Sequence, residues 1–253
     1  PAWFKTHVST IPATKGAVVL FNDTFMNYNT PQVGIATVEV LEKAGYKVIL
    51  ANSQCCGRPM ISKGLLDEAK VVAQHNVNLL SPYVKEGIPV VGCEPSCLLT
   101  LRDEYPDLLA NQASKHLAAN SFVIDEFLDL LNQKDGLDLE FSDETKKILF
   151  HGHCHQKALV GTTASLRTLR LPPNYRVEEV DSGCCGMAGA FGFEAEHYDV
   201  SMAIGRQHLL PAVESKPNDW EIAIMGVSCR QQIEHGTSHQ PRHLIEVFRD
   251  ALV

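Results

Sequence analysis

The sequence has no long apolar run, no basic block and no secretory leader, and each absence removes a class of protein. Its apolar runs fall well short of the ~20 residues that a helix needs to cross a bilayer, and no signal peptide opens the chain. We therefore expect a cytoplasmic protein. The formal net charge of −8 argues against a nucleic-acid partner. Because the chain begins at Pro1 rather than Met, we expect a piece of a longer polypeptide.

The common signatures of catalytic and nucleotide-binding sites are missing too. The sequence contains no Gly-x-Ser-x-Gly elbow and no His-Glu-x-x-His motif. Glycines around Phe191 precede a predicted helix, as in a phosphate cradle, but their order is not that of a P-loop and its lysine is absent. We therefore expect these glycines to allow close packing near the metal centre that the cysteines described below predict. We expect no complete catalytic site in this chain.

What the sequence does contain is cysteine in an unusual pattern. Of its eight cysteines, four lie in two adjacent pairs, Cys55-Cys56 and Cys184-Cys185, and glycine follows each pair. Neighbouring cysteines do not easily bridge each other, because a disulfide between them distorts the peptide. In a chain this long without a leader, cysteines are more often metal ligands or redox groups than a disulfide scaffold. The pairs predict a metal centre, with iron and sulfide favoured.

Apolar strands alternate with helical patterns along the whole chain. Strands are expected at residues 17–21, 46–50, 88–92, 147–150, 176–180 and 222–225. Long helices are expected at 63–85 and 194–214. This alternation is typical of an α/β protein with parallel sheets and crossover helices. Each cysteine group follows a strand directly, which is where α/β proteins place ligands.

Landmarks of the first half recur in the second. The matching pairs are Leu20-Phe21 with Leu149-Phe150, Cys55-Cys56 with Cys184-Cys185, and Ser96-Cys97 with Ser228-Cys229. The first two differ by 129 positions and the third by 132, which indicates a duplicated unit. In this register Cys154 falls opposite Phe25, and Cys93 has no counterpart in the second half.

The repeat predicts the domain organisation. We expect two Rossmann-like βαβ halves, residues 17–105 and 147–253, related by a pseudo-twofold axis. A linker or docking arm, residues 1–16, precedes them, and a helical connector, residues 106–146, joins them.

The second half offers a complete set of four thiolate ligands. They are Cys154, Cys184, Cys185 and Cys229. They follow three different strands, and such loops meet at one edge of a parallel sheet, so we expect the thiolates to converge on one metal centre. Gly183 and Gly186 allow a positive φ and a close approach of the backbone to the cofactor.

Two histidines, His153 and His155, flank Cys154, and His151 belongs to the same run. A histidine beside a cysteine is a candidate ligand for zinc or iron. It is equally a candidate hydrogen-bond donor to sulfur or an ordinary core residue. Because the cysteines already suffice as ligands, we favour His153 and His155 as donors that orient the cofactor.

The first half offers the same number of cysteines with different spacing. They are Cys55, Cys56, Cys97 and Cys93. For Cys93 two interpretations are equally open, a metal ligand and an inert buried thiol at the end of a strand.

Together these motifs resemble the CCG cysteine-rich domain, over about residues 17–250. The resemblance is carried by the runs Cys55-Cys56-Gly57-Arg58-Pro59, Glu94-Pro95-Ser96-Cys97, His151-Gly152-His153-Cys154-His155, Asp181-Ser182-Gly183-Cys184-Cys185-Gly186 and Ser228-Cys229-Arg230. The family includes iron–sulfur subunits of glycolate oxidase, anaerobic glycerol-3-phosphate dehydrogenase and lactate-utilisation systems, and one of the subunits of heterodisulfide reductase. The likeness is strongest to the C-terminal part of flavin-linked D-lactate dehydrogenase and glycolate oxidase-type proteins.

This sequence departs from the family pattern in three places. Some relatives close each half with Cys-x-x-Cys, whereas Cys93 and Cys97 are separated by three residues and the second half keeps only Cys229. The first half also lacks an opening cysteine. The sequence therefore does not assure a full five-cysteine noncubane site, as in heterodisulfide reductase, in either half.

The resemblance implies an iron–sulfur electron-transfer module with a 4Fe–4S cluster of conventional or noncubane type. FAD and the oxidation of a lactate- or glycolate-type D-2-hydroxy acid would belong to a partner flavoprotein, accompanied by a ferredoxin-like domain or subunit. Electrons would pass to a quinone or another acceptor, and a partner would account for any association with a membrane surface. Two alternatives stay open: a structural zinc site for folding or docking, and a cluster-based disulfide reductase, against which the missing ligands argue.

Overall fold

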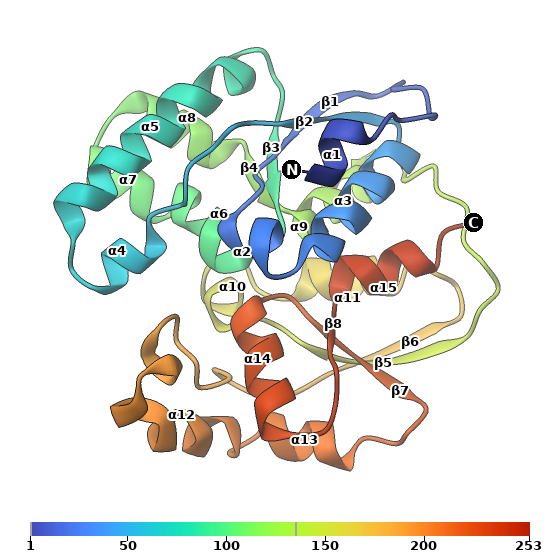
Figure 1. The fold of residues 1–253 in the computed structure, drawn as a ribbon. Coiled ribbons are helices and arrows are strands. Elements are labelled where there is room, and N and C mark those ends of the chain that lie inside the picture. The colour runs from blue at the N-terminus through green and yellow to red at the C-terminus, as the bar shows by residue number, and fades with distance from the viewer. Residues whose placement is uncertain (1, 135) are drawn as a thin grey trace. The chain divides into compact units, whose positions relative to one another are not determined.

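The computed structural model describes residues 2–134 and 136–253. These residues belong to two compact units, Pro1–Leu139 (unit 1) and Glu140–Val253 (unit 2). Each unit is an α/β layer structure built on one parallel four-stranded sheet (Figure 1). The predicted fold class, an α/β protein with two similar halves and parallel sheets, is confirmed.

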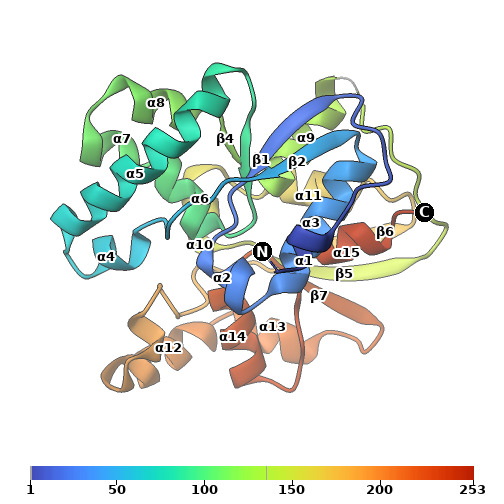
Figure 2. The same cartoon turned by 45° about the horizontal axis from the view of Figure 1, so that its top comes forward.

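Unit 1 has the strand order β2-β1-β3-β4. Its strands are β1 (Gly16–Leu20), β2 (Tyr46–Leu50), β3 (Val90–Gly92) and β4 (Ser121–Val123). Its helices are α1 (Ala2–Thr6), α2 (Thr24–Tyr28), α3 (Pro31–Lys43), α4 (Arg58–Ser62), α5 (Leu66–Lys85), α6 (Pro95–Arg102), α7 (Glu104–Leu109), α8 (Gln112–Ala119) and α9 (Ile124–Lys134). Helices α3 and α9 lie on one side of the sheet and α5 to α8 on the other (Figures 1 and 2).

Unit 2 repeats this arrangement with the strand order β6-β5-β7-β8. Its strands are β5 (Lys146–His151), β6 (Tyr175–Glu179), β7 (Trp220–Ile224) and β8 (Arg242–His243). Its helices are α10 (Cys154–Leu159), α11 (Thr163–Leu169), the short η1 (Phe191–Phe193) and η2 (Ala195–His197), α12 (Tyr198–Gly205), α13 (Leu209–Ser215), α14 (Val227–Gly236) and α15 (Leu244–Asp250). Helices α10, α11 and α15 cover one face of the sheet, and α12 to α14 cover the other (Figures 1 and 2).

The central strands are buried on both faces, which explains their continuous apolar sequences. Val18 and Val19 of β1 are fully buried, as are Ile148 and Phe150 of β5. In both units the chain crosses from the central strand to one neighbour and then back to the other. Ligands of open α/β sheets bind outside the carboxyl ends of the strands at such a reversal. The reversal lies between β1 and β3 in unit 1, and between β5 and β7 in unit 2.

One of the two predicted long helices is present and the other is broken. The pattern at 63–85 matches α5, which begins at Leu66 after a turn around Gly64, whose φ is +74°. The pattern at 194–214 gives η2, α12 and α13 instead of one helix. A Cβ on Gly205, at the end of α12, would lie 3.0 Å from the Cys185 carbonyl oxygen, so the helix ends where it approaches the cysteine loop. Close packing therefore overrides the helical pattern.

The segments outside the two predicted halves contain regular structure. Residues 106–146 contribute β4 and α9 to the first sheet and its cover. Residues 2–6 form α1, and His7 Nε2 lies 2.9 Å from the Glu42 carboxylate of α3. The predicted division at residues 16, 105 and 146 stays a prediction. Among the described residues, no helix is both long and apolar enough to cross a membrane.

Strand pairing corrects the register of the internal repeat by one residue. Leu20 pairs with Leu50 in unit 1, and Phe150 pairs with Glu179 in unit 2. Leu50 and Glu179 each end a strand five residues before the first cysteine of a pair. Leu20 therefore corresponds to Phe150, and not to Leu149 as the apolar pattern predicted.

The corrected register changes the residue that matches Cys154. The residue before helix α2 is Asp23 and the residue before α10 is His153; each is an N-cap whose side chain accepts a backbone N–H. The first helical residues are accordingly Thr24 and Cys154. Thr24, and not Phe25, occupies in unit 1 the place of Cys154 in unit 2.

Candidate metal centre

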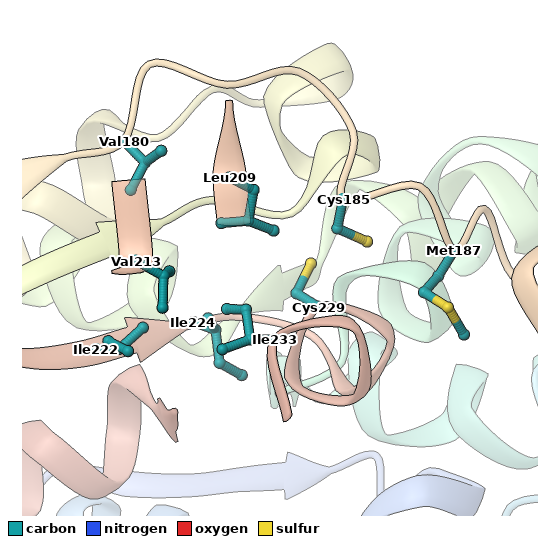
Figure 3. Packing of buried hydrophobic residues seen from close by; sticks show 9 residues of the cluster. All are labelled: Val180, Cys185, Met187, Leu209, Val213, Ile222, Ile224, Cys229 and Ile233. Carbon is teal, nitrogen blue, oxygen red and sulfur yellow. The ribbon is translucent and has the colours of Figure 1, made fainter. Parts of the chain in front are cut away.

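Three loops of unit 2 bring four cysteine sulfurs together at the carboxyl edge of the sheet. Cys154 follows β5, Cys184 and Cys185 follow β6, and Cys229 follows β7. The Cys154 thiol hydrogen-bonds to Cys184, and Cys185 hydrogen-bonds to both Cys184 and Cys229. Figure 3 shows Cys185 and Cys229 side by side, with the sulfur of Cys229 pointing toward the loop that carries Cys185. The four predicted side chains are thus linked by pairwise contacts at this edge of the sheet, and their role as metal ligands stays a prediction.

The four thiols of this cluster differ in pKa. Hydrogen bonding to Cys184, followed by burial, raises the pKa of Cys154 and of Cys185. The same contacts hold the pKa of Cys184 well below its usual value, chiefly through the hydrogen bond from Cys154. Cys184 and Cys229 thus have a lowered pKa, while Cys154 and Cys185 have a raised one. A thiophilic cation bound here would replace the thiol protons, because metal ligands must be deprotonated.

One side of the cluster is sealed by the apolar core. Cys185 and Cys229 are 2% and 0% exposed, whereas Cys154 and Cys184 are half-buried. The apolar neighbours in the same cluster are Val180, Met187, Leu209, Val213, Ile222, Ile224 and Ile233 (Figure 3). A centre held here would be shielded from water on the side of Cys229 and reachable on the side of Cys154.

The loop that carries Cys184 and Cys185 depends on Gly186. Its φ is +103°, and a Cβ built there would lie 2.1 Å from the Ser201 carbonyl oxygen. Gly186 N–H donates to the Cys184 sulfur at 3.3 Å. The predicted positive φ is thus present at Gly186. Gly183 has no positive φ, and an added Cβ there meets nothing within 4 Å.

A lysine fixes the start of this loop. Lys157 Nζ, from α10, donates to the Ser182 carbonyl oxygen at 2.5 Å. His151 Nδ1, at the end of β5, lies 2.9 Å from Ser182 Oγ. The loop after β6 is therefore tied to the loop after β5, which keeps Cys154 and Cys184 in contact.

The histidines have different places around the cluster. His153 Nδ1 accepts the His155 N–H at 3.2 Å as the N-cap of α10, and the Cys154 sulfur accepts the same backbone N–H. His153 also lowers the pKa of Cys229 through its charge. Whether His153 and His155 contact a cofactor stays a prediction.

The sequence pattern placed His151 in the histidine run around Cys154 but favoured His153 and His155 over it. The His151 ring is fully buried, and its interaction with Cys229 lowers the pKa of that thiol, after the larger effect of Cys185. His151 ends β5 and pairs with Ile224 of β7, five residues before Cys229. The register of a parallel pair would have revealed this neighbour, but register was unknown from sequence.

Unit 1 brings together three of its four cysteines. Cys55 hydrogen-bonds to Cys56, and Cys56 hydrogen-bonds to Cys97. The hydrogen bond from Cys56 lowers the pKa of Cys97, but burial, Asp23 and Glu94 together raise it to about 11. The order of contacts is the same as in unit 2.

Cys93 has different surroundings. Its sulfur lies 2.9 Å from Thr37 Oγ1 on α3. Complete burial, and then the charges of Asp23, Asp125 and Glu94, raise its pKa. These contacts favour the interpretation of Cys93 as a buried structural thiol over that of a ligand, and the choice between the two stays a prediction.

Two buried polar side chains hold the loop of Cys55 and Cys56. Asn76 Nδ2 donates to the Cys55 carbonyl oxygen at 3.1 Å and to Tyr105 Oη at 2.9 Å. Tyr105 in turn donates to the Cys56 carbonyl oxygen at 2.9 Å. Both side chains are fully buried, so this loop is part of the rigid interior.

Comparison with known proteins agrees with this site. Residues 19–102 match the family model described as a cysteine-rich CCG domain. Lactate utilization protein A of Exiguobacterium is 31% identical over 253 residues, which cover 93% of this chain and 96% of that protein. The chain belongs to the CCG family.

Two further relatives are longer than this CCG chain. One subunit of the anaerobic glycerol-3-phosphate dehydrogenase of Escherichia coli K12 is 33% identical over 99% of the chain, which spans 63% of that relative. D-2-hydroxyglutarate dehydrogenase of the same organism is 28% identical over 92% of the chain, which spans 23% of that protein. The CCG chain thus corresponds to only part of either relative.

A solved structure shares the fold. A hypothetical protein from Helicobacter pylori superposes with a TM-score of 0.53 at 12% identity, covering 97% of this CCG chain and 51% of that one. At this identity the likeness concerns the fold alone.

We predict that Gly186→Ala destabilises unit 2 by about 2 kcal/mol or more. The backbone at this position has a positive φ, which strains alanine, and the new methyl group clashes with the Ser201 carbonyl. Urea unfolding of the metal-free protein measures the change. Gly183→Ala is the matched control and should stay within about 0.5 kcal/mol of the parent. Equal losses in both variants would contradict this account of the loop.

We predict that Tyr105→Phe lowers the free energy of unfolding by about 1–3 kcal/mol, because the buried Cys56 carbonyl and Asn76 amide lose a partner. Tyr28→Phe is the control, since Tyr28 is 81% exposed. Thermal unfolding of the two variants compares them. A Tyr105→Phe protein as stable as the control would remove the role given to this hydroxyl.

Proposed function

We propose that this chain is the iron–sulfur component of a flavin-linked dehydrogenase. The observation that carries the proposal is the chain of sulfur contacts that joins Cys154 to Cys184, Cys184 to Cys185 and Cys185 to Cys229 at one edge of the second sheet. Tetrathiolate sites of this kind hold iron–sulfur clusters. The names of the relatives, two dehydrogenases and a lactate-utilisation protein, support the dehydrogenase context.

The protein's own contribution is to bind the centre and set its surroundings. Cys229 lies in the first turn of α14, so backbone N–H groups at that helix end stabilise its thiolate. The buried ring of His151 lies near the same sulfur and lowers the pKa of the Cys229 thiol. When bound, an iron–sulfur cluster would accept and release single electrons. The half-buried Cys154 and Cys184 mark the side on which a redox partner would approach.

The finer part of the proposal concerns the partners. Electrons would come from FAD on a partner flavoprotein that oxidises a D-2-hydroxy acid of the lactate or glycolate type. A ferredoxin-like domain or subunit would accompany it, and a quinone or another acceptor would receive the electrons. The names of the relatives support this arrangement, since one is a single subunit of a dehydrogenase. The chain itself would contribute no substrate chemistry.

The experiment that tests the proposal is metal and acid-labile sulfide analysis of protein purified without air. We expect about four irons with matching sulfide per occupied site, and a brown colour. Stoichiometric zinc without sulfide in the anaerobic preparation would overturn the proposal in favour of a structural zinc site.

We predict that Cys185→Ser loses the metal of unit 2 and unfolds more easily when reconstituted than the parent does, because metal binding at such a site contributes to folding. Cys93→Ser is the matched control, since that thiol contacts Thr37. It should keep the full metal content. An unchanged iron content in Cys185→Ser would refute the ligand assignment.

We predict that His151→Ala keeps its iron but shifts the reduction potential to a lower value, because a donor near the Cys229 sulfur is removed and the sulfur becomes more electron-rich. A redox titration measures the shift, and His208→Ala, at an exposed position, serves as control. Loss of iron in His151→Ala would instead make this histidine a ligand.

A further inference from the structure

Unit 1 reproduces three quarters of the thiolate site of unit 2. Cys55, Cys56 and Cys97 follow β2 and β3, as Cys184, Cys185 and Cys229 follow β6 and β7. The hydrogen bonds among the three sulfurs run in the same order in both units. The lining of a metal site is therefore present in unit 1, with one position left to explain.

That position belongs to Thr24. Strand pairing and the N-caps of α2 and α10 place Thr24 at the position of Cys154. The contact also corresponds, because the side chain of Thr24 hydrogen-bonds to Cys55 as Cys154 does to Cys184. A neutral hydroxyl replaces a thiol at the one place where the two sites differ.

The other polar groups near this site have their own hydrogen bonds. Asp23 Oδ1 accepts the Met26 N–H at 3.0 Å as the cap of α2. Glu94 Oε1 accepts from Ser96 Oγ at 2.7 Å at the start of α6. Cys93 lies against Thr37. Each of these three side chains is buried and already has a hydrogen-bond partner. Thr24, which contacts Cys55, is exposed to solvent.

Exposure of the fourth position has a chemical consequence. A metal held by three protein ligands keeps its remaining position for water or substrate, which is what separates reactive sites from closed structural ones. In unit 1 the side of Cys97 and Cys56 is sealed, at 5% and 1% exposure, while Cys55 and Thr24 face outward. An open position would therefore lie where a ligand from solution reaches it.

We propose that unit 1 holds a second iron–sulfur site, bound by Cys55, Cys56 and Cys97, whose fourth metal position beside Thr24 is taken by an exchangeable ligand from solution. The ligand class is a small sulfur or oxygen donor, such as a low-molecular-weight thiol or hydroxide. This inference shares the metal chemistry of the proposed function but concerns a different site. The electron-transfer role of unit 2 does not require it.

The test separates the two sites by mutation. In the full chain, Cys185→Ser removes the metal of unit 2, and the iron and sulfide that remain report on unit 1. The inference expects about half of the parent's iron to remain. We further expect β-mercaptoethanol to change the electron paramagnetic resonance spectrum of the reduced protein, because a thiol binds at the open position.

Thr24→Cys, added to Cys185→Ser, completes the site. It should abolish the change caused by β-mercaptoethanol and slow the loss of iron to a chelator several-fold, because a fourth thiolate closes the position. Thr6→Cys, on α1 and exposed, is the matched control and should leave both measurements unchanged.

The outcomes distinguish this inference from the proposed function. If the parent contains cluster iron but Cys185→Ser contains none, unit 1 has no cluster and the inference fails while the proposed function stands. If Cys185→Ser keeps about half of the parent's iron but β-mercaptoethanol and Thr24→Cys have no effect, the position is closed and the inference again fails. A parent without iron and sulfide overturns the proposed function itself.

Discussion

The structure depends on one geometric constraint, that loops following neighbouring parallel strands emerge at the same edge of a sheet. In unit 2 this constraint brings Cys154, Cys184 and Cys229 into one cluster although they lie far apart in the sequence. Contacts among these sulfurs raise the pKa of some thiols and lower that of others, because negative charge on all of them together would be repulsive without a cation. Gly186 and Lys157 serve the same end, since each fixes the path of a loop. The fold thus provides a donor set that a thiophilic metal would complete.

The two units use the same geometry with different electrostatics. Around Cys229 lie His151 and His153, which favour the thiolate. Around Cys97 lie Asp23 and Glu94, which oppose it. Burial, and then Glu94, raise the pKa of Asp23 to about 7, so this carboxyl is partly protonated near neutral pH. A centre in unit 1 would therefore carry a less favourable environment for negative charge than one in unit 2, consistent with three thiolates there and four in unit 2.

The fold was predictable because buried parallel strands have plain apolar sequences, such as Val18 to Phe21 and Ile148 to Phe150. The fourth strands, β4 and β8, span three and two residues, too few to show a pattern. The predicted long helix at 194–214 is broken in part because Gly205 approaches the carbonyl of Cys185, and such a tertiary contact is invisible in sequence. Cysteine spacing predicted which side chains of unit 2 converge. It did not identify Thr24 as the counterpart of Cys154, and it did not favour His151. A strand buried on both faces tolerates a shift of one residue in its apolar pattern. Only the strand pairing therefore reveals which residues of the two halves correspond.

The central claim is that the clustered thiolates of unit 2 hold iron and sulfide. X-ray absorption at the iron and zinc edges of anaerobically purified protein tests it most directly, because it reports the metal and its neighbours in one measurement. The account predicts iron with sulfur neighbours and a second shell of iron scatterers. Zinc in stoichiometric amount, with sulfur neighbours and no iron–iron scattering, would contradict it.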